Sequence, residues 1–193
     1  MKIFDDVISE QSQINLEKLF SDPAFPWYFN ASTIGDNPQR GSEYHLASGY
    51  PDAPQFVHSF VNANDKENTF CSPALEHIMK YLGWDDLVEK LSLPKYIIRI
   101  KSNLLLPVQQ KDHPPHMDYD MPHEVMIYYV KDSDGPTKFY KRDGDNFIVT
   151  DEVMPKRGRF LVFPGNTYHS STAPTNYDSR CVINFNLCDY GRK

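Results

Sequence analysis

The sequence predicts a mainly β protein: a double-stranded β-helix (jelly-roll, cupin-like) core with supporting N-terminal helices. In the second half of the chain, short β-rich runs alternate with turn residues. These runs are YIIRIK, EVMIYYV, TKFYKR, NFIVT, RFLVF and RCVINFNL. No helical pattern lies between them, as a parallel α/β fold would need, and the helical periodicity is confined to the first half.

One domain accounts for the whole chain. With 193 residues, of which 40% are hydrophobic, the chain can build one substantial core and is short for two. We therefore expect a single domain over residues 1–193. Residues 1–94 would form a helical and β support region, and residues 95–188 the double-stranded β-helix core with the functional site.

Two helices are expected in the support region. The first runs from about Ser9 to Phe20, where apolar residues recur at helical spacing. The second has Ser72 as its N-cap and Pro73 at its first position, and it ends at Gly83. The following WDDLVEKL is interpreted as a short turn, and residues 41–61 as a loop with one or two strands. In the barrel, DGDN at 143–146 predicts a hairpin turn.

Charge and cysteine content limit the partners and the compartment. A formal net charge of −6 makes nucleic acid an unlikely partner and gives no attraction to an anionic membrane. Cys71, Cys181 and Cys188 are odd in number and lack CxxC spacing, which suits reduced thiols. The first residues, MKIFDDVISEQ, lack the basic flank and apolar run of a signal peptide. We expect a soluble, cytoplasmic protein.

The segment HPPHMDYDMPH at 113–123 carries the first candidate site. His116 and Asp118 are two residues apart, so a strand would place both on one face, where they form a typical pair of metal ligands. The third candidate is His169, about fifty residues later and just past RFLVF. Two histidines and one carboxylate on one face of an octahedron are the ligands of non-haem Fe(II) oxygenases. A structural zinc site would need a fourth ligand, usually cysteine.

Arg180 adds an anion site to this arrangement. Strand alternation places Arg180, Val182, Asn184 and Asn186 on one face of the last strand. If that face lines the barrel, a guanidinium is buried there, and an unpaired buried charge costs several kcal/mol. The planar guanidinium therefore needs an anion, for which a carboxylate is the natural partner.

These residues, in this order, resemble the Fe(II)- and 2-oxoglutarate-dependent dioxygenases. The similarity is greatest to prolyl-4-hydroxylase-like and phytanoyl-type enzymes, including compact forms encoded by tailed phages of marine cyanobacteria. Besides HxD, the distal histidine and the arginine, it rests on IYYVKDSDGPTKFY, PKRGRFLVFPGNTYH and RCVINFNL. It covers residues 95–188 densely and the first half loosely. One departure is DGPT, which has the single Gly135 where the family commonly has two glycines.

The resemblance implies an activity and residue roles. The chain would be a hydroxylase of a protein side chain or a small molecule, coupling 2-oxoglutarate decarboxylation to C–H oxidation. Its cofactors would be Fe(II), 2-oxoglutarate and O₂, with ascorbate as an optional addition. His116, Asp118 and His169 would be the catalytic metal ligands. Arg180 and Tyr129 would bind the distal carboxylate of the cosubstrate. Asn184, on the last strand, would also contact the cosubstrate, and Asn103 is a further candidate.

Two other interpretations remain open at this point. A cupin-like metal enzyme that does not use 2-oxoglutarate would bind its metal through His116, His123, Glu124 and His169. A non-catalytic barrel would use its groove to bind a peptide or a sugar and would not retain a metal tightly. The remaining histidines are expected to be packed or exposed, with His113 in a loop. The basic cluster Lys156, Arg157 and Arg159 is interpreted as a solvated turn.

Overall fold

The computed structural model describes residues 1–32, 52–62, 70–109 and 112–189. Within these ranges, eight strands form one large antiparallel sheet in the order β1-β9-β6-β11-β5-β3-β2, with β4 also paired to β3. The strands are β1 (Lys2–Phe4), β2 (Tyr28–Asn30), β3 (Gln55–Asn62), β4 (Phe70–Cys71), β5 (Tyr96–Leu105), β6 (Glu124–Tyr129), β9 (Phe160–Pro164) and β11 (Arg180–Cys188).

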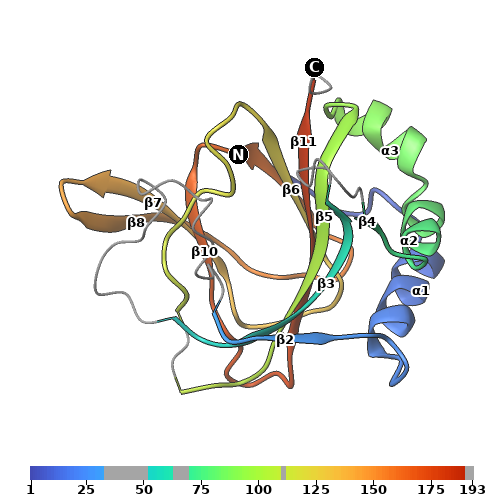
Figure 1. Cartoon of the computed structure of the whole chain (residues 1–193), viewed down its shortest axis with the longest axis horizontal. Helices are drawn as coiled ribbons and strands as arrows, with labels where there is room; N and C mark the ends of the chain where they lie inside the picture. The colour runs from blue at the N-terminus through green and yellow to red at the C-terminus, as the bar shows by residue number, and fades with distance from the viewer. Residues whose placement is uncertain (33–51, 63–69, 110–111, 190–193) are drawn as a thin grey trace.

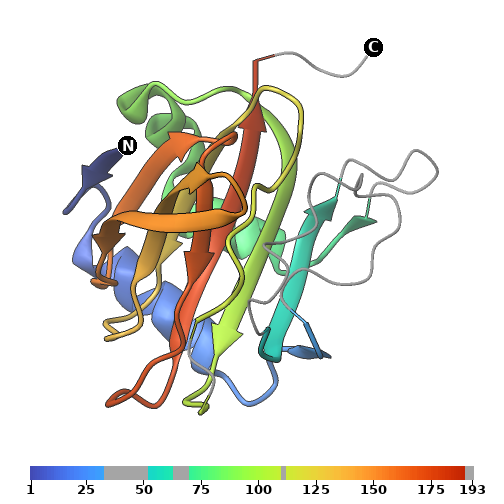
Figure 2. The same cartoon turned by 90° about the vertical axis from the view of Figure 1, so that its left-hand side faces the viewer.

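A second, smaller sheet faces the large one. It has the order β10-β7-β8 and consists of β7 (Thr137–Asp143), β8 (Asn146–Val153) and β10 (Tyr168–Ser171). Figure 1 shows this sheet on one side of the large sheet and the helices on the other. Figure 2, viewed from the side of the small sheet, shows its β7–β8 hairpin in front of the large sheet. The expected hairpin turn is confirmed, because Asp143 pairs with Asn146 and Gly144 has a φ of +59°.

The fold class predicted from the sequence is confirmed. The six β-rich runs correspond to β5, β6, β7, β8, β9 and β11. The two facing antiparallel sheets form the double-stranded β-helix, and the helices lie outside it. Within the described part of the chain, no helix combines the length and apolarity needed to cross a membrane.

The two expected helices are present, although the second begins later than predicted. The first is α1 (Glu10–Ser21), where the hydroxyl of Ser9 accepts the backbone N–H of Ser12. The second is α2 (Leu75–Leu82), so the expectation that Ser72 is its N-cap was wrong. The Ser72 hydroxyl instead lies 2.8 Å from Nε2 of His58 and accepts the N–H of Ala74, in a turn that precedes the helix.

The interpretation of WDDLVEKL as a short turn was also wrong. This segment is α3 (Trp84–Leu91), and the left-handed Gly83 that ends α2, as expected, also precedes α3. Its helical form follows from the apolar pair Leu87 and Leu91, four residues apart, which both become buried. Of the segment 41–61, residues 41–51 lie outside the described residues, and the rest contains most of β3.

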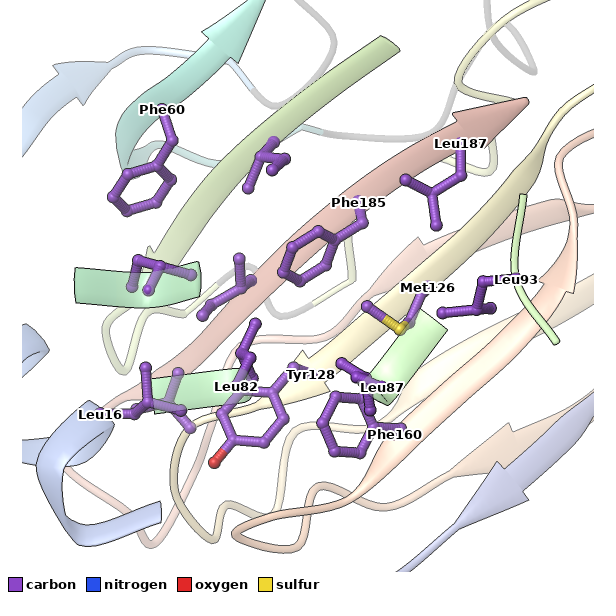
Figure 3. Close-up of a cluster of buried hydrophobic side chains, with 14 of the residues drawn as sticks. Leu16, Phe60, Leu82, Leu87, Leu93, Met126, Tyr128, Phe160, Phe185 and Leu187 are labelled. Atoms are coloured by element: carbon purple, nitrogen blue, oxygen red, sulfur yellow. The ribbon is translucent and has the colours of Figure 1, made fainter. Parts of the chain in front are cut away.

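The main hydrophobic core lies between the helices and the large sheet, as Figure 3 shows. Residues with odd numbers on β11, among them Ile183 and Phe185, face this core, and Trp84 of α3 stacks on Phe185 at 5.2 Å between ring centroids. Val182 belongs instead to a second cluster between the two sheets. The alternation expected for RCVINFNL therefore separates a helix-facing side from a barrel-facing side, which begins with Arg180.

The basic cluster is an anchor for the N-terminal segment and not simply a solvated turn. Asp5 accepts hydrogen bonds from Nε and Nη2 of Arg159, both at 2.9 Å, and lies 3.3 Å from Nζ of Lys156. Arg157 contacts Glu17 of α1 at 3.4 Å. These contacts hold β1 and α1 against the β8–β9 connection.

We predict that Asp5→Asn lowers stability at neutral pH and removes part of its acid dependence. Hydrogen bonding to Arg159 is the main cause that lowers the pKa of Asp5 from 3.8 to about 2. Because the folded pKa is depressed, the stabilisation is complete above pH 3.8 and is lost as the pH falls towards about 2. Solvent screening limits it to about 1 kcal/mol. Urea titrations of both proteins between neutral pH and pH 2.5 would measure this, and parallel pH profiles would contradict it.

Candidate metal site

Backbone pairing brings the two histidines of the candidate site together. His116 and His169 form an antiparallel bridge in which each backbone N–H donates to the other's carbonyl, both at 2.9 Å. Together with a second bridge between Asp112 and Thr172, this bridge places the segment from Asp112 to His116 alongside β10. The imidazole rings lie on the same side, with centroids 4.7 Å apart.

Asp118 completes a group of three metal-ligating side chains. One ligand atom from each of His116, Asp118 and His169 lies within 4.8 Å of the others, and Nε2 of His116 is 3.9 Å from Oδ1 of Asp118. Among the histidine, cysteine, aspartate and glutamate side chains of the described ranges, these three form the cluster that could hold a metal ion. Asp118 and His169 are buried, and the side chain of His116 is 13% exposed.

Hydrogen bonds fix which nitrogen of each imidazole is available to a metal. Nδ1 of His116 lies 3.0 Å from the carbonyl of Pro114, and Nδ1 of His169 lies 3.0 Å from the carbonyl of Thr167. A carbonyl oxygen only accepts, so each Nδ1 carries the proton and donates it. The lone pair of each neutral ring is therefore on Nε2, as metal-binding histidines require.

Burial keeps both imidazoles neutral. It lowers the pKa of His116 from 6.5 to about 3, with a further contribution from the neighbouring His169. Burial also lowers the pKa of His169, although the charge of Asp118 opposes the shift. At neutral pH, the two rings thus present lone pairs without first losing a proton.

Asp118 is held by a set of polar residues around it. Its Oδ1 accepts from Nη2 of Arg99 at 2.9 Å, and its Oδ2 accepts from Nδ2 of Asn186 at 2.7 Å and of Asn184 at 3.2 Å. Burial alone would raise the pKa of Asp118, but the charge of Arg99 and smaller effects of nearby groups hold it well below its usual value. Sequence reasoning missed Arg99, whose only signal is its alternation with apolar neighbours in YIIRIK.

Arg180 lies at the other side of the same cavity, 2% exposed. Its Nε donates to the carbonyl of Gly135 at 2.8 Å and its Nη2 to Oγ1 of Thr137 at 2.7 Å, where the Tyr129 hydroxyl also lies at 2.7 Å. Burial lowers the pKa of this guanidinium. Within the described parts of the chain, no carboxylate forms a salt bridge with Arg180.

The single glycine of DGPT has a structural reason. A Cβ on Gly135 would collide with the backbone carbonyl of Thr172 and with the backbone of Ala173 and Pro174. The carbonyl of Gly135 is therefore held close to the strand connection that leads to Arg180. One glycine at this position is enough for the turn to approach the 172–174 backbone.

The cavity between the sheets joins the metal group to Arg180. It contains about 420 Å³ of empty space, part of it open to solvent. Its lining includes predicted residues, namely His116, His169, Arg180, Asn184 and Asn103, and residues that sequence reasoning missed, namely Lys101, Thr137, Ser170 and Ser171. Asn103 donates to Gln55 at 2.6 Å. The Oδ1 of Asn184 is buried and has no hydrogen-bond partner among the described residues.

The two adjacent tyrosines of β6 face opposite sides of the sheet. Tyr129 lies beside Thr137, and the Arg180 guanidinium is 5.7 Å from the centroid of its ring. Tyr128 belongs to the helix-facing core, and its buried hydroxyl has no hydrogen-bond partner among the described residues. Only Tyr129 is therefore placed to act with Arg180.

The alternative ligands are not part of the metal group. Nδ1 of His123 lies 2.8 Å from the carbonyl of Met121, and its ring packs so closely on Gly165 that a Cβ there would collide with it. Glu124 is at the start of β6, paired with Pro164 of β9. The group that the structure brings together in its described part includes neither His123 nor Glu124.

The other histidines have structural surroundings. His113 is buried, with Nδ1 3.2 Å from Asp52. His58 is buried, and both of its ring nitrogens are hydrogen-bonded, to Pro26 and Ser72. His77 is exposed on α2. His45 lies outside the described residues.

The residues present fit a divalent iron ion. Two neutral imidazoles and one ionised carboxylate form the donor set of the 2-His-1-carboxylate facial triad, which leaves coordination positions for other ligands. A structural zinc site would have four protein ligands, and the group in the described residues supplies three. His116, Asp118 and His169 would hold the ion.

Similar proteins are found among the solved structures, and the similarity is one of fold. Neither a protein-family model nor a curated protein matches the sequence. Among solved structures, the chain is similar to SnoN, a non-heme alpha-ketoglutarate-dependent epimerase from nogalamycin biosynthesis, with a TM-score of 0.61 and 13% identity over 97% of this chain and 76% of that one. The chain is also similar to a 2OG-Fe(II) oxygenase family oxidoreductase from Burkholderia pseudomallei, with a TM-score of 0.61 and 14% identity over 92% of this chain and 78% of that one.

A third similar structure is a prolyl hydroxylase from Trichoplax adhaerens in complex with a hypoxia inducible factor peptide, with a TM-score of 0.53 and 12% identity over 96% of this chain and 82% of that one. The chain has the fold of the 2-oxoglutarate and Fe(II) oxygenases. At these low identities, the comparison extends to the fold and not to the activity.

We predict that metal binding resists mild acid. If both histidines had ordinary pKa values, the metal affinity would fall on the order of 100-fold between about pH 7.5 and 5.5, because both rings would become protonated. With the pKa of His116 at about 3 and that of His169 also lowered, we expect a clearly smaller loss of affinity over the same pH range. The electron paramagnetic resonance signal of free Mn(II) would measure binding. A loss of affinity with a midpoint near pH 6.5 would contradict the assigned proton states.

Proposed function

We propose that this protein is an Fe(II)- and 2-oxoglutarate-dependent dioxygenase that hydroxylates a protein side chain or a small molecule. One observation carries the proposal: a buried guanidinium without a carboxylate partner in the described residues shares a cavity with the imidazoles of His116 and His169, which converge with the carboxylate of Asp118. Such a guanidinium calls for an anionic ligand, and a keto-diacid would offer one carboxylate to Arg180 and its keto-acid end to the metal.

Arg180 and its neighbours would hold the distal carboxylate of 2-oxoglutarate. The carbonyl of Gly135 fixes Nε of Arg180, and Thr137 orients both Nη2 and the Tyr129 hydroxyl. These contacts set the plane of the guanidinium before a ligand binds, which reduces the entropy lost on binding. Thr137 is thus a positioning residue, whereas Arg180 and Tyr129 would contact the cosubstrate.

His116, Asp118 and His169 would hold the iron at the other end of the cosubstrate. Bound Fe(II) would supply the coupling between O₂ and 2-oxoglutarate, in which one oxygen atom enters succinate, CO₂ is released and the other oxygen atom enters a substrate C–H bond. The protein contributes the geometry, the neutral rings and a cavity lined mostly by buried residues. The buried Oδ1 of Asn184 would accept a hydrogen bond from a ligand of this cavity.

Both substrate classes have support among the similar structures. The prolyl hydroxylase was solved with a peptide, and the epimerase belongs to the biosynthesis of nogalamycin, a small molecule. The cytoplasmic location, the single-domain organisation and the affiliation with compact phage forms stay predictions from the sequence. Release of succinate from 2-oxoglutarate, measured against peptide, amino-acid and small-molecule pools, would identify the class.

We predict that Fe(II) and 2-oxoglutarate together give a visible charge-transfer band in the absence of O₂. His116→Ala should abolish the band because it removes a metal ligand. Arg180→Met should raise the 2-oxoglutarate concentration for half-maximal absorbance on the order of 100-fold, since a buried ion pair is lost. Tyr129→Phe should raise it about fivefold, the equivalent of one hydrogen bond.

Tyr128→Phe is the matched control. It makes the same chemical change one residue away, in the helix-facing core, and removes a hydroxyl that has no hydrogen-bond partner among the described residues. The band should be unchanged and stability equal or higher. A metal-loaded protein that released no succinate from any substrate pool would refute the enzymatic proposal, and one that retained no metal would favour the non-catalytic barrel.

A further inference from the structure

The carboxylate of Asp118 is surrounded by donors from two neighbouring strands. Arg99 lies on β5 directly opposite Asn186 of β11, and Asn184 is two residues before Asn186 on the same face. Nε of Arg99 donates to Oδ1 of Asn186 at 3.0 Å, and its Nη2 donates to Asp118. Asn186 therefore accepts from Arg99 and donates to Asp118, so the three side chains form a closed ring of hydrogen bonds.

The ring is buried and braced. Arg99 is 8% exposed, Asn186 is fully buried and Asp118 is 3% exposed. The guanidinium of Arg99 also lies 5.1 Å from the ring centroid of Tyr119, the residue that follows Asp118 in the chain. A guanidinium held on one side by an amide, on another by a carboxylate and on a third by an aromatic ring has little freedom to turn.

The donors leave Asp118 one place for a metal. A carboxylate offers about four lone-pair positions, two on each oxygen. Asn184 and Asn186 occupy Oδ2, and Arg99 occupies one position on Oδ1. The remaining position belongs to Oδ1, the oxygen that lies nearest Nε2 of His116.

We propose that Arg99, Asn184 and Asn186 form a carboxylate cradle that fixes Asp118 as a ligand through one oxygen, and that Arg99 is the positioning residue of the cradle. The inference rests on the metal site of the proposed function. It adds a residue far from Arg180, on a strand that carries no metal ligand, and it explains why two asparagines follow one another on the barrel-facing side of β11.

The cradle predicts that an external carboxylate can replace Asp118. Asp118→Ala should weaken Mn(II) binding at least on the order of 100-fold, because a ligand is lost while the donors remain. Formate supplies the same carboxylate group without a side chain, and it should raise the Mn(II) affinity of the Asp118→Ala variant about tenfold. In the double variant Arg99→Met with Asp118→Ala, formate should restore none. Formate rescue that persists in the double variant would overturn the proposal.

The single substitution Arg99→Met should lower Mn(II) affinity about 10- to 100-fold, the usual cost of removing a group that orients a ligand. Arg99→Lys keeps the charge, but a lysine cannot reach Asp118 and Asn186 together. The logarithm of its Mn(II) affinity should therefore lie closer to that of Arg99→Met than to that of the wild type. Arg142→Met, on the exposed end of the β7–β8 hairpin, is the control and should bind Mn(II) as the wild type does.

If Arg99→Met does not fold, Asn186→Leu tests the same cradle and should lower Mn(II) affinity in the same range. Wild-type affinity in a folded Arg99→Met or Asn186→Leu protein would overturn the proposal. Because Mn(II) binding needs neither 2-oxoglutarate nor turnover, failure of the cradle is distinct from failure of the proposed function. The latter would appear as a wild-type protein without measurable Mn(II) binding.

Discussion

The reciprocal pair of backbone hydrogen bonds between His116 and His169 is the interaction on which the site depends. It joins two segments that are far apart in the chain and places both imidazoles on one side. In an antiparallel pair, such a bridge also fixes the register, so a slip by one residue would turn a ring away from its partner. Ligand convergence is thus a consequence of strand pairing, before any metal is bound.

The two faces of the large sheet have different roles in holding the polar groups of the cavity. On β11, one side chain in two packs against the helices, which keeps the strand in place through hydrophobic burial. The alternate side chains include Arg180, Asn184 and Asn186, which would be costly to bury without partners. Each donates a hydrogen bond to a residue outside β11, so the stable core on one face supports a polar, preorganised cavity on the other.

Strand periodicity and residue order were sufficient to predict the fold class and the convergence of His116, Asp118 and His169. The alternation in RCVINFNL indicated the barrel-facing side. The HxD spacing correctly predicted that His116 and Asp118 lie close together, although the segment is not a regular strand: His116 forms a single bridge and Asp118 lies in a bend. Helix boundaries were less predictable, because the Ser72 hydroxyl is engaged by His58, a contact between distant segments. The same limit applies to Arg99, whose role depends on its register with Asn186. Pairing between strands is long-range information that periodicity along one strand does not contain.

A crystal structure of the protein with Mn(II) and 2-oxoglutarate, obtained without O₂, would test the assigned site most directly. We predict one Mn(II) ion bound by Nε2 of His116, Nε2 of His169 and a single oxygen of Asp118, with the distal carboxylate of 2-oxoglutarate on the guanidinium of Arg180. Anomalous scattering that placed the metal on other residues, or a cosubstrate that did not contact Arg180, would contradict this assignment.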